Sequence, residues 1–357
     1  MSTFLLVLVG ILMFGLLIAV HEFGHFIVAK LSGVRVNEFA IGMGPKLWSK
    51  QGSETLYSLR LFPIGGYCAM EGEDEDTGDP RSFHRAKLWK KFLILVAGAT
   101  MNFLVGFLIF LGLYAASQSY YVDVVAGFEP WSTLPAQGLE IGDQFLSVDG
   151  HAIWIDGDTQ LFLGRTGERA DIEVLRNGQR VLLKDVDMTK TPVAQADGTT
   201  RLLLGVSVDT KAYPASLGDR LRLSWYYSID TVRLVWISLG DLLTGAVGVR
   251  DMSGPVGIVD MMGQMASNAG STSIALISIL KFVAFIAINL AVMNLLPIPA
   301  LDGGRIFFLL VNLIYTAFTK RHLDPKYEGT VNTVFFVALL GLMAVVAVSD
   351  VLKLFGR

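Results

Sequence analysis

The sequence predicts a multi-pass α-helical membrane protein with four transmembrane helices, a membrane-associated β-hairpin element and an inserted extracytoplasmic β-rich domain. Three observations predict this class. The chain of 357 residues is 52% hydrophobic and only 17% charged, whereas soluble domains are about a quarter charged. Four apolar stretches are long enough to cross a bilayer, for which about 20 residues suffice. Two other segments show the alternation and turn residues of strands.

The predicted spans are residues 4–29, 92–116, 273–301 and 331–352. No basic region precedes the first span and no small-residue cleavage site follows it, so we expect it to be retained and not removed as a signal peptide. The resulting organisation is a first membrane half over 1–116, a β-rich domain over 117–215, an amphipathic linker over 216–272 and a second membrane half over 273–357.

Basic residues beside the spans predict the orientation in the membrane. The loop after the first span carries Lys30, Lys87, Lys90 and Lys91, and the loop after the third span carries Arg305, Lys320, Arg321 and Lys326. Loops rich in Lys and Arg remain cytoplasmic. We therefore expect both of these loops inside, and both termini and the β-rich domain outside.

The segments between the spans show local structure. Residues near 35–70 alternate apolar positions with Gly, Pro and Ser turns, which predicts a β element. In the β-rich domain, a strand at Gln144–Val148 precedes the turn Asp149-Gly150, and Asn177-Gly178 lies between two strands as a hairpin turn. From 217 to 242, apolar residues recur every three or four positions, so we expect an amphipathic helix on the membrane surface.

The composition excludes several kinds of site. The chain has one cysteine, Cys68, so it can form neither an intrachain disulfide nor a thiolate zinc cluster. Its net charge of −3 gives no indication of nucleic-acid binding. Three of the five histidines, His84, His151 and His322, stand among polar residues, where we expect ordinary solvated side chains.

The remaining two histidines form an H-E-x-x-H motif near the end of the first span. His21 and His25 are four residues apart, so one helical face presents both side chains to one metal ion. Glu22 is placed to take a proton from the water that such a metal activates. Ionisable groups in hydrocarbon are costly and usually functional, so the motif predicts a catalytic metal site.

A catalytic zinc needs a third protein ligand besides an open position, and Asp302 is the best candidate. It is the only acidic residue between Ser271 and Tyr315. Both the first and the third span run from outside to inside, and both the histidines and Asp302 lie near the inner ends. With a rise of about 1.5 Å per residue, we expect all three at a similar depth in the cytoplasmic half.

The stretch before Asp302 offers a further polar group. Pro297 and Pro299 cannot continue a regular helix, and irregular backbone within a membrane is tolerated where it lines a cavity. Asn294 lies beside this break. Its side chain could hydrogen-bond a substrate carbonyl or stabilise an oxyanion. An interhelical hydrogen bond explains this residue equally well.

With these motifs, the sequence resembles the site-two protease family of intramembrane zinc metalloproteases. The likeness is carried by "HEFGH" at 21–25, "NLLPIPALDGG" at 294–304, "GLEIGDQFLSVDG" at 138–150 and "MSGPVGI" at 252–258, and it extends over most of the chain. It is strongest to the bacterial regulator-of-sigma-E protease type, which carries a PDZ domain between spans two and three. Many relatives have two PDZ domains, whereas 117–215 has room for one.

The resemblance implies a site and a substrate class. His21, His25 and Asp302 would bind Zn²⁺, Glu22 would be the catalytic base, and Asn294 with Pro297 and Pro299 would position the substrate. The β element near 35–70 would pair with an unwound substrate, and the PDZ-like domain would screen substrates and take a peptide C-terminus. Expected partners are the lipid bilayer and single-span membrane proteins, such as trimmed anti-sigma factors or signal-peptide remnants, in a bacterial cytoplasmic membrane.

Two other functions fit parts of the pattern. A metal transporter could use buried His and Asp residues as a transit site, although it would need neither Glu22 as a base nor an external peptide-binding domain. An inactive scaffold could bind partners through the PDZ-like domain, although the intact Glu22 argues against it.

Overall fold

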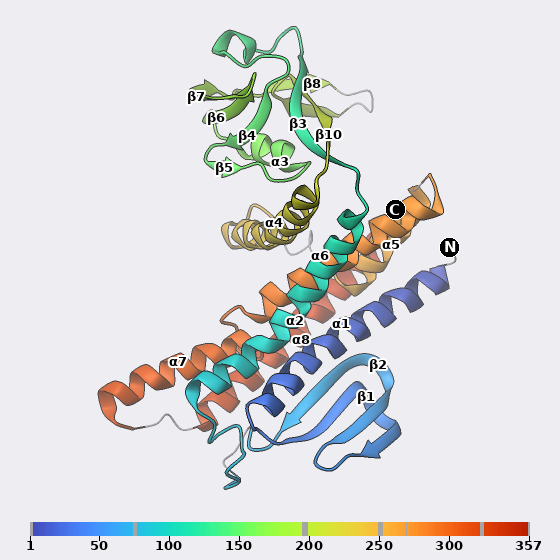
Figure 1. Cartoon of the computed structure of the whole chain (residues 1–357), viewed down its shortest axis with the longest axis vertical. Coiled ribbons are helices and arrows are strands. Elements are labelled where there is room, and N and C mark those ends of the chain that lie inside the picture. Colours follow the sequence, from blue (N-terminus) through green and yellow to red (C-terminus); the bar gives the residue numbers. More distant parts are fainter. Residues whose placement is uncertain are drawn as a thin grey trace. The chain divides into compact units, whose positions relative to one another are not determined.

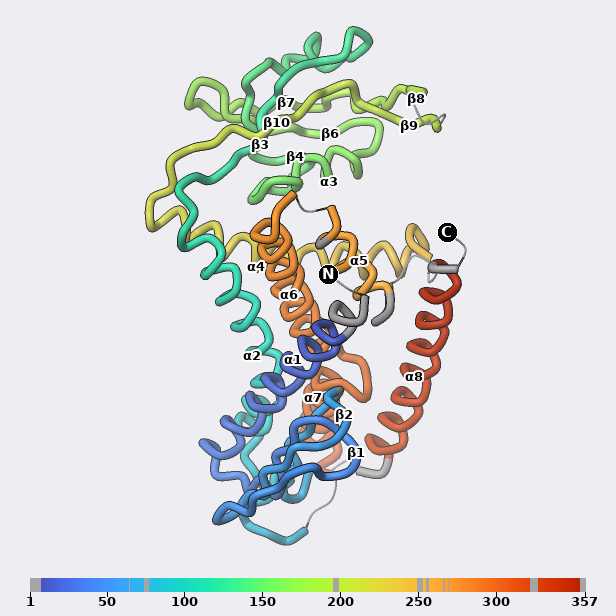
Figure 2. The backbone as a smooth tube through the Cα atoms, turned by 90° about the vertical axis from the view of Figure 1, so that its right-hand side faces the viewer, coloured from blue at the N-terminus to red at the C-terminus, as the bar shows by residue number. Residues whose placement is uncertain are grey.

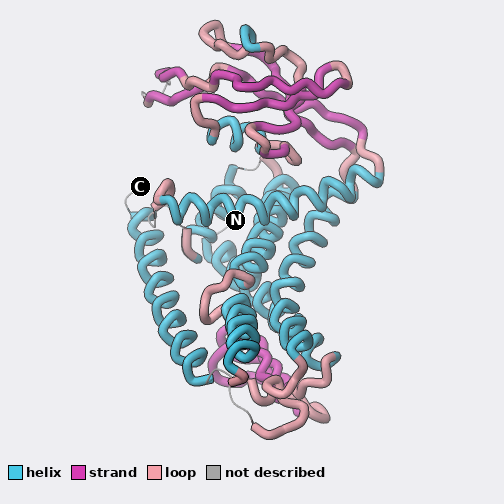
Figure 3. The backbone as a smooth tube through the Cα atoms, turned by 90° about the vertical axis from the view of Figure 1, so that its left-hand side faces the viewer, coloured by secondary structure: helices cyan, strands magenta, loops and turns pink. Residues whose placement is uncertain are grey.

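A computed structural model describes residues 3–73, 77–194, 199–248, 253–268, 270–321 and 325–355. The chain forms two compact units, one from Met1–Ile109 with Thr231–Arg357 and the other from Phe110–Asp230. The strands fall into two groups, a hairpin in the first unit and a domain in the second (Figure 3). His322, and Met252 of the "MSGPVGI" motif, lie outside the described residues.

Four of the described helices are long and apolar enough to cross a membrane. They are α1 (Thr3–Leu31), α2 (Leu88–Ala115), α6 (Thr272–Asn294) and α8 (Pro325–Phe355), shown in Figure 1. Each corresponds to one predicted span. Of the most apolar stretch of each, 39% is buried in α1 but only 6% in α8, so the apolar side chains of α8 are suited to contact with lipid.

The third span is shorter than predicted. Helix α6 ends at Asn294, and turns occupy the residues up to Leu301, because Pro297 and Pro299 lack the N–H groups that a helix needs. A new helix, α7 (Asp302–Thr319), begins at the predicted ligand Asp302. The sequence pattern predicted the break but not this helix.

Helix α5 (Pro255–Asn268) packs against α1 and α6 through Met262, which meets Leu17 and Phe282 in one buried cluster. Its N-terminus is capped by a distant side chain. Asp350 of α8, only 2% exposed, accepts hydrogen bonds of 2.9 Å from the N–H groups of both Gly254 and Gly257. A carboxylate satisfies the free N–H groups at a helix start, so this contact joins α5 to the end of α8.

The predicted β element is confirmed as an antiparallel hairpin of β1 (Val36–Gln51) and β2 (Leu56–Met70). Figure 2 shows it alongside the second half of α1. The strands bend strongly, so that Phe39 pairs with both Cys68 and Tyr57. Cys68 is buried where the hairpin packs against α1 and α2.

A charged cluster stabilises the bent hairpin. The hydroxyl of Ser58 donates a 2.6 Å hydrogen bond to Oε1 of Glu38, and Arg60 donates another of 2.8 Å. Burial by itself raises the pKa of Glu38, but these two hydrogen bonds, a third from Tyr67 and the charge of Arg60 together outweigh it and lower the pKa to about 2. Glu38 is therefore ionised at neutral pH and bridges β1 to β2.

The second unit contains an antiparallel sheet in the order β10-β3-β4-β6-β7, with β5 paired to β4. Its strands are β3 (Ser119–Phe128), β4 (Gln144–Val148), β5 (His151–Ala152), β6 (Arg169–Arg176), β7 (Gln179–Asp187) and β10 (Val206–Pro214). The smaller elements are η1 (Pro135–Gln137), α3 (Asp158–Arg165) and the pair β8 (Thr191–Ala194) and β9 (Thr200–Leu203). The predicted strand Gln144–Val148 is confirmed.

The predicted hairpin around Asn177-Gly178 is also confirmed, between β6 and β7. Asn177 has φ 50° and Gly178 has φ 81°, which are the positive values that a two-residue hairpin turn requires.

The long helix α4 (Leu217–Thr244) matches the predicted amphipathic segment and exposes Leu217, Trp225 and other large apolar side chains. Its location on a membrane surface stays a prediction.

Candidate metal centre

Helix α1 brings its two histidines to one point. His21 and His25 are 9% and 6% exposed, and their Nε2 atoms are 3.1 Å apart. The four-residue spacing places them on one face of the helix. Both Nε2 atoms therefore face the same small volume.

Asp302, the first residue of α7, completes this group from a distant part of the chain. Its Oδ2 atom lies 3.0 Å from Nε2 of His21 and 3.3 Å from Nε2 of His25. One ligand atom from each of the three residues falls within 4.8 Å of the others. Among the described residues, this is the one group of three or more His, Cys, Asp or Glu side chains that could hold a metal ion.

The turn before Asp302 packs closely against the two glycines that follow Asp302 in α7. A Cβ on Gly303 would lie 2.2 Å from the carbonyl oxygen of Leu296, and one on Gly304 would lie 2.3 Å from that of Ile298. Contacts below 3.0 Å force the backbone to move. The glycines thus let the chain fold back closely enough for Asp302 to start a helix beside the histidines.

The other atom of each imidazole ring is also engaged. Nδ1 of His25 lies 2.7 Å from the carbonyl oxygen of Ile94 in α2, which fixes the proton on Nδ1 and leaves Nε2 as a lone-pair donor. Nδ1 of His21 lies 3.4 Å from the amide nitrogen of Asn294 and 3.4 Å from that of Asn102. Asn294, the last residue of α6, thus lies beside His21.

Glu22 is partly exposed and lies next to the hairpin. A Cβ added to Gly66 of β2 would come 3.4 Å from Cγ of Glu22. The structure thus brings the backbone of β2 to the side of the glutamate. Pro297 and Pro299 lie in the turn between α6 and α7, within five residues of Asp302.

Helix α2 contributes residues that the sequence pattern did not identify. Ile94, Gly98 and Asn102 follow at intervals of four, so they share one face of α2. A Cβ on Gly98 would lie 2.4 Å from Nε2 of His25, so only glycine allows the ring this close. The signal for Asn102 was its amide within an apolar span, where a polar side chain calls for a partner.

The residues present suit a zinc ion. Two neutral imidazoles and one carboxylate form the donor set of catalytic zinc sites, with a position left for water or substrate. Oδ2 of Asp302 receives no well-directed hydrogen bond within the part of the chain that the structure describes, so its lone pairs remain directed at the point that the three side chains share. The close packing of Gly98 keeps the rings at that point.

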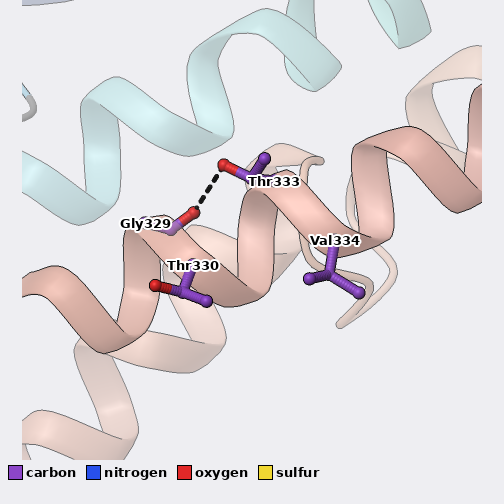
Figure 4. A pocket seen from close by; sticks show the side chains of 4 residues that line it. All are labelled: Gly329, Thr330, Thr333 and Val334. Atoms are coloured by element: carbon purple, nitrogen blue, oxygen red, sulfur yellow. Dashed lines mark hydrogen bonds between the residues drawn. The ribbon is translucent and has the colours of Figure 1, made fainter.

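Two other features are the exposed histidines and a surface hollow on α8. His84 and His151 are exposed, as predicted for solvated side chains. The hollow is lined by Gly329, Thr330, Thr333 and Val334 (Figure 4), and the Thr333 hydroxyl donates a 2.9 Å hydrogen bond to the Gly329 carbonyl within its own helix. None of these four side chains titrates near neutral pH, so the hollow offers no catalytic group.

Comparison with known proteins gives a consistent result. The model of peptidase family M50 matches residues 9–342. The chain belongs to peptidase family M50. A relative from Clostridium perfringens is 38% identical over 97% of this chain and 98% of its own length. A protein of Shouchella clausii and one of Geobacillus kaustophilus, each named zinc metalloprotease RasP, are 30% and 28% identical over 97% of this chain. The match over nearly the whole chain includes His21, His25 and Asp302 of the candidate metal centre.

Proposed function

We propose that this peptidase is an intramembrane zinc metalloprotease that hydrolyses a peptide bond in or near the transmembrane segment of single-span membrane proteins. The observation that carries the proposal is the convergence of His21 and His25, within the apolar helix α1, with Asp302 at the start of α7, and with Glu22 between the histidines. Ionisable groups in such helices are retained when they serve a function. The names of the RasP relatives support zinc as the metal.

The residues of the site divide the reaction between them. Zinc held by His21, His25 and Asp302 would supply a Lewis acid that polarises the scissile carbonyl and acidifies water. Glu22 takes the proton from the attacking water and later gives it to the leaving amine. Asn294 donates its amide N–H to the substrate carbonyl, while Pro297 and Pro299 keep the neighbouring backbone out of a helix.

The hairpin supports the cleavage of an extended substrate. The peptide bonds of a transmembrane helix are shielded by their own hydrogen bonds, so a protease must first extend the chain, and addition to a strand edge stabilises the extended form. Residues 66–70 of β2 pair with residues 36–41 of β1 along one strand edge, and this is the one pairing that the described residues show for 66–70. Because Gly66 lies beside Glu22, a substrate added to the other edge runs past the catalytic base.

The position of the site along the predicted spans indicates the depth in the membrane at which the substrate is cleaved. Basic residues in the loops place the inner ends of α1 and α6 on the cytoplasmic side under the positive-inside rule. The protease then acts in the inner half of a bacterial cytoplasmic membrane, with both termini and the β-rich domain outside. The family resemblance favours trimmed anti-sigma factors or signal-peptide remnants as substrates.

The β-rich domain is proposed to be a PDZ-like module that binds a peptide C-terminus. Strand β10 is at the edge of its sheet, with β3 as its neighbour, so a peptide could add as the next strand. Such a module outside the membrane would admit only substrates that have already been trimmed.

Cleavage of a defined substrate tests the function. A tagged single-span membrane protein, shortened on its external side, is co-expressed with wild type, Glu22→Gln or Asp302→Ala. We expect cleavage with wild type only, because Gln cannot accept the proton and Ala removes a ligand. Cleavage by Glu22→Gln contradicts the mechanism. If wild type cleaves no trimmed substrate but moves zinc across the membrane, the protein is a transporter.

Metal content tests the centre separately. Purified wild type should contain one zinc per chain, because the described residues hold one three-ligand group. The His21→Ala/His25→Ala double variant should contain none. One zinc per chain in that double variant would rule out this centre.

A further inference from the structure

Asn102 is a polar side chain buried in the middle of apolar helix α2. It is 1% exposed, its Nδ2 atom lies 3.4 Å from Nδ1 of His21, and its Oδ1 atom has no hydrogen-bond partner among the described residues. Burying an amide oxygen without a partner costs free energy. Such a group in a native protein therefore calls for an explanation.

The chemistry of His21 decides which of the two amide atoms of Asn102 should face its ring. Its Nε2 atom faces Asp302 and His25, so Nε2 is the atom directed at the metal position. A neutral imidazole that binds metal through Nε2 carries its proton on Nδ1, and that N–H needs an acceptor. For His25 the acceptor is the Ile94 carbonyl, at 2.7 Å.

The N–H group at Nδ1 of His21 requires an acceptor, but the two side-chain atoms placed beside it are amide nitrogens. Nδ2 of Asn102 and Nδ2 of Asn294 both lie 3.4 Å from Nδ1, and an amide nitrogen only donates. A half-turn of the Asn102 amide about χ2 exchanges its oxygen and nitrogen without changing the space that it fills. The oxygen then takes the place 3.4 Å from Nδ1.

We infer that Asn102 is a positioning residue, whose Oδ1 accepts the Nδ1–H of His21 and holds the ring with Nε2 free to bind zinc. This inference rests on the proposed zinc site. Of the two asparagines, Asn102 suits this role better because it is fully buried and held within a continuous helix. Asn294 is only partly buried at the end of α6, where its N–H group remains available to a substrate.

The inference gives α2 a defined part in the site. On one face of this helix, the Ile94 carbonyl is the acceptor for His25 and the Asn102 amide is the acceptor for His21. Between them, Gly98 lets the backbone of α2 come close to both imidazole rings. Both imidazole rings are then oriented by groups of a single helix. Partners of this kind typically change metal affinity by about 10- to 100-fold when removed.

Zinc affinity of the purified, detergent-solubilised full chain tests the inference, by competition with a chromophoric zinc chelator. Asn102→Leu keeps the side-chain size but removes the acceptor, so we expect affinity to fall about 10- to 100-fold. Asn102→Asp keeps an acceptor oxygen and should bind zinc at least as tightly as wild type. A purely structural amide would not give this difference between Leu and Asp.

Three further variants complete the design. Thr100→Val removes an exposed hydroxyl of α2 that bonds its own helix, and should leave affinity within twofold of wild type. Asn294→Leu should lose less zinc affinity than Asn102→Leu. His21→Ala must abolish high-affinity binding, and if it does not, the zinc site itself is wrong and the proposed function fails with it.

Two results would overturn the inference while leaving the zinc site intact. One is Asn102→Leu binding zinc within twofold of wild type while His21→Ala does not bind. The other is a folded Asn102→Asp protein whose affinity falls tenfold or more, which remains decisive even if Asn102→Leu fails to fold. Where the first result is accompanied by loss of affinity in Asn294→Leu, the acceptor is Asn294.

Discussion

Substituting Gly98 by alanine tests how closely α2 must approach His21 and His25. The added Cβ would lie 2.4 Å from Nε2 of His25 and 2.7 Å from both Cε1 and Nε2 of His21, whereas ordinary van der Waals contact begins at 3.4 Å. The His25 ring, or the helix that carries it, must therefore move by about 1 Å. Metal–ligand distances tolerate deviations of only about 0.2 Å, so Gly98→Ala should disrupt the site.

The expected loss is large because both histidines are affected. A misplacement of about 1 Å can lower activity about 100-fold, which corresponds to about 2.7 kcal/mol of transition-state stabilisation. We expect Gly98→Ala to contain well under one zinc per chain and to show at least this loss in kcat/KM on a trimmed single-span substrate. Zinc content and kcat/KM are measured on the same purified sample, and thermal unfolding shows whether the variant is folded.

Gly112→Ala is the matched control in the same helix. A Cβ on Gly112 meets nothing within 4 Å, and alanine is the better helix former by about 1 kcal/mol. This variant should keep zinc, activity and stability. If Gly98→Ala keeps one zinc per chain and the kcat/KM of wild type, then the close approach of α2 does not constrain the histidines and the reasoning is refuted.

Two further predictions concern stability. Asp350→Ala leaves the N–H groups of Gly254 and Gly257 without their acceptor and should lower the free energy of unfolding by about 1–2 kcal/mol, measured by thermal denaturation in detergent. Asp350→Asn retains an acceptor oxygen and should lose less, and equal losses would contradict the capping role. Because the folded-state pKa of Glu38, about 2, lies below its ordinary 4.5, its stabilisation is complete above pH 4.5 and is lost as the pH falls toward 2. Glu38→Gln should therefore be less stable than wild type at pH 7, and this difference should shrink below pH 4.5; a difference independent of pH would refute the assignment.

The sequence was most informative in two situations. One is a feature whose cause is local, such as a turn, and the other is a residue whose burial costs free energy. The hairpin turn at Asn177-Gly178 needs positive φ at both positions, and this residue pair supplies it whatever surrounds it. His21 and His25 stood out because ionisable groups within an apolar span require a use, and Asp302 stood out as the only acidic residue between Ser271 and Tyr315. Their common depth was predicted from the positions and orientation of the spans and the helix rise, and the structure brings one atom of each of these side chains within 4.8 Å of the others.

The break before Asp302 shows where local reasoning stopped. Pro297 and Pro299 predicted that a helix cannot continue, but not that α7 starts at Asp302 itself. That start depends on Gly303 and Gly304 packing against the carbonyl groups of the preceding turn. A Gly-Gly pair in a sequence indicates freedom of the backbone, and only the folded turn shows that the freedom is used for close packing.

The role of α2 was hidden for a different reason. Every residue has a backbone carbonyl, so nothing in the sequence distinguishes the Ile94 carbonyl, which holds His25 across 69 positions of the chain. Asn102 did differ from its apolar neighbours, but an amide in a membrane helix has many possible partners. Its partner follows only from the geometry: Nε2 of His21 is directed at Asp302, so Nδ1 must carry the proton, and the amide oxygen that could accept it otherwise has no partner among the described residues.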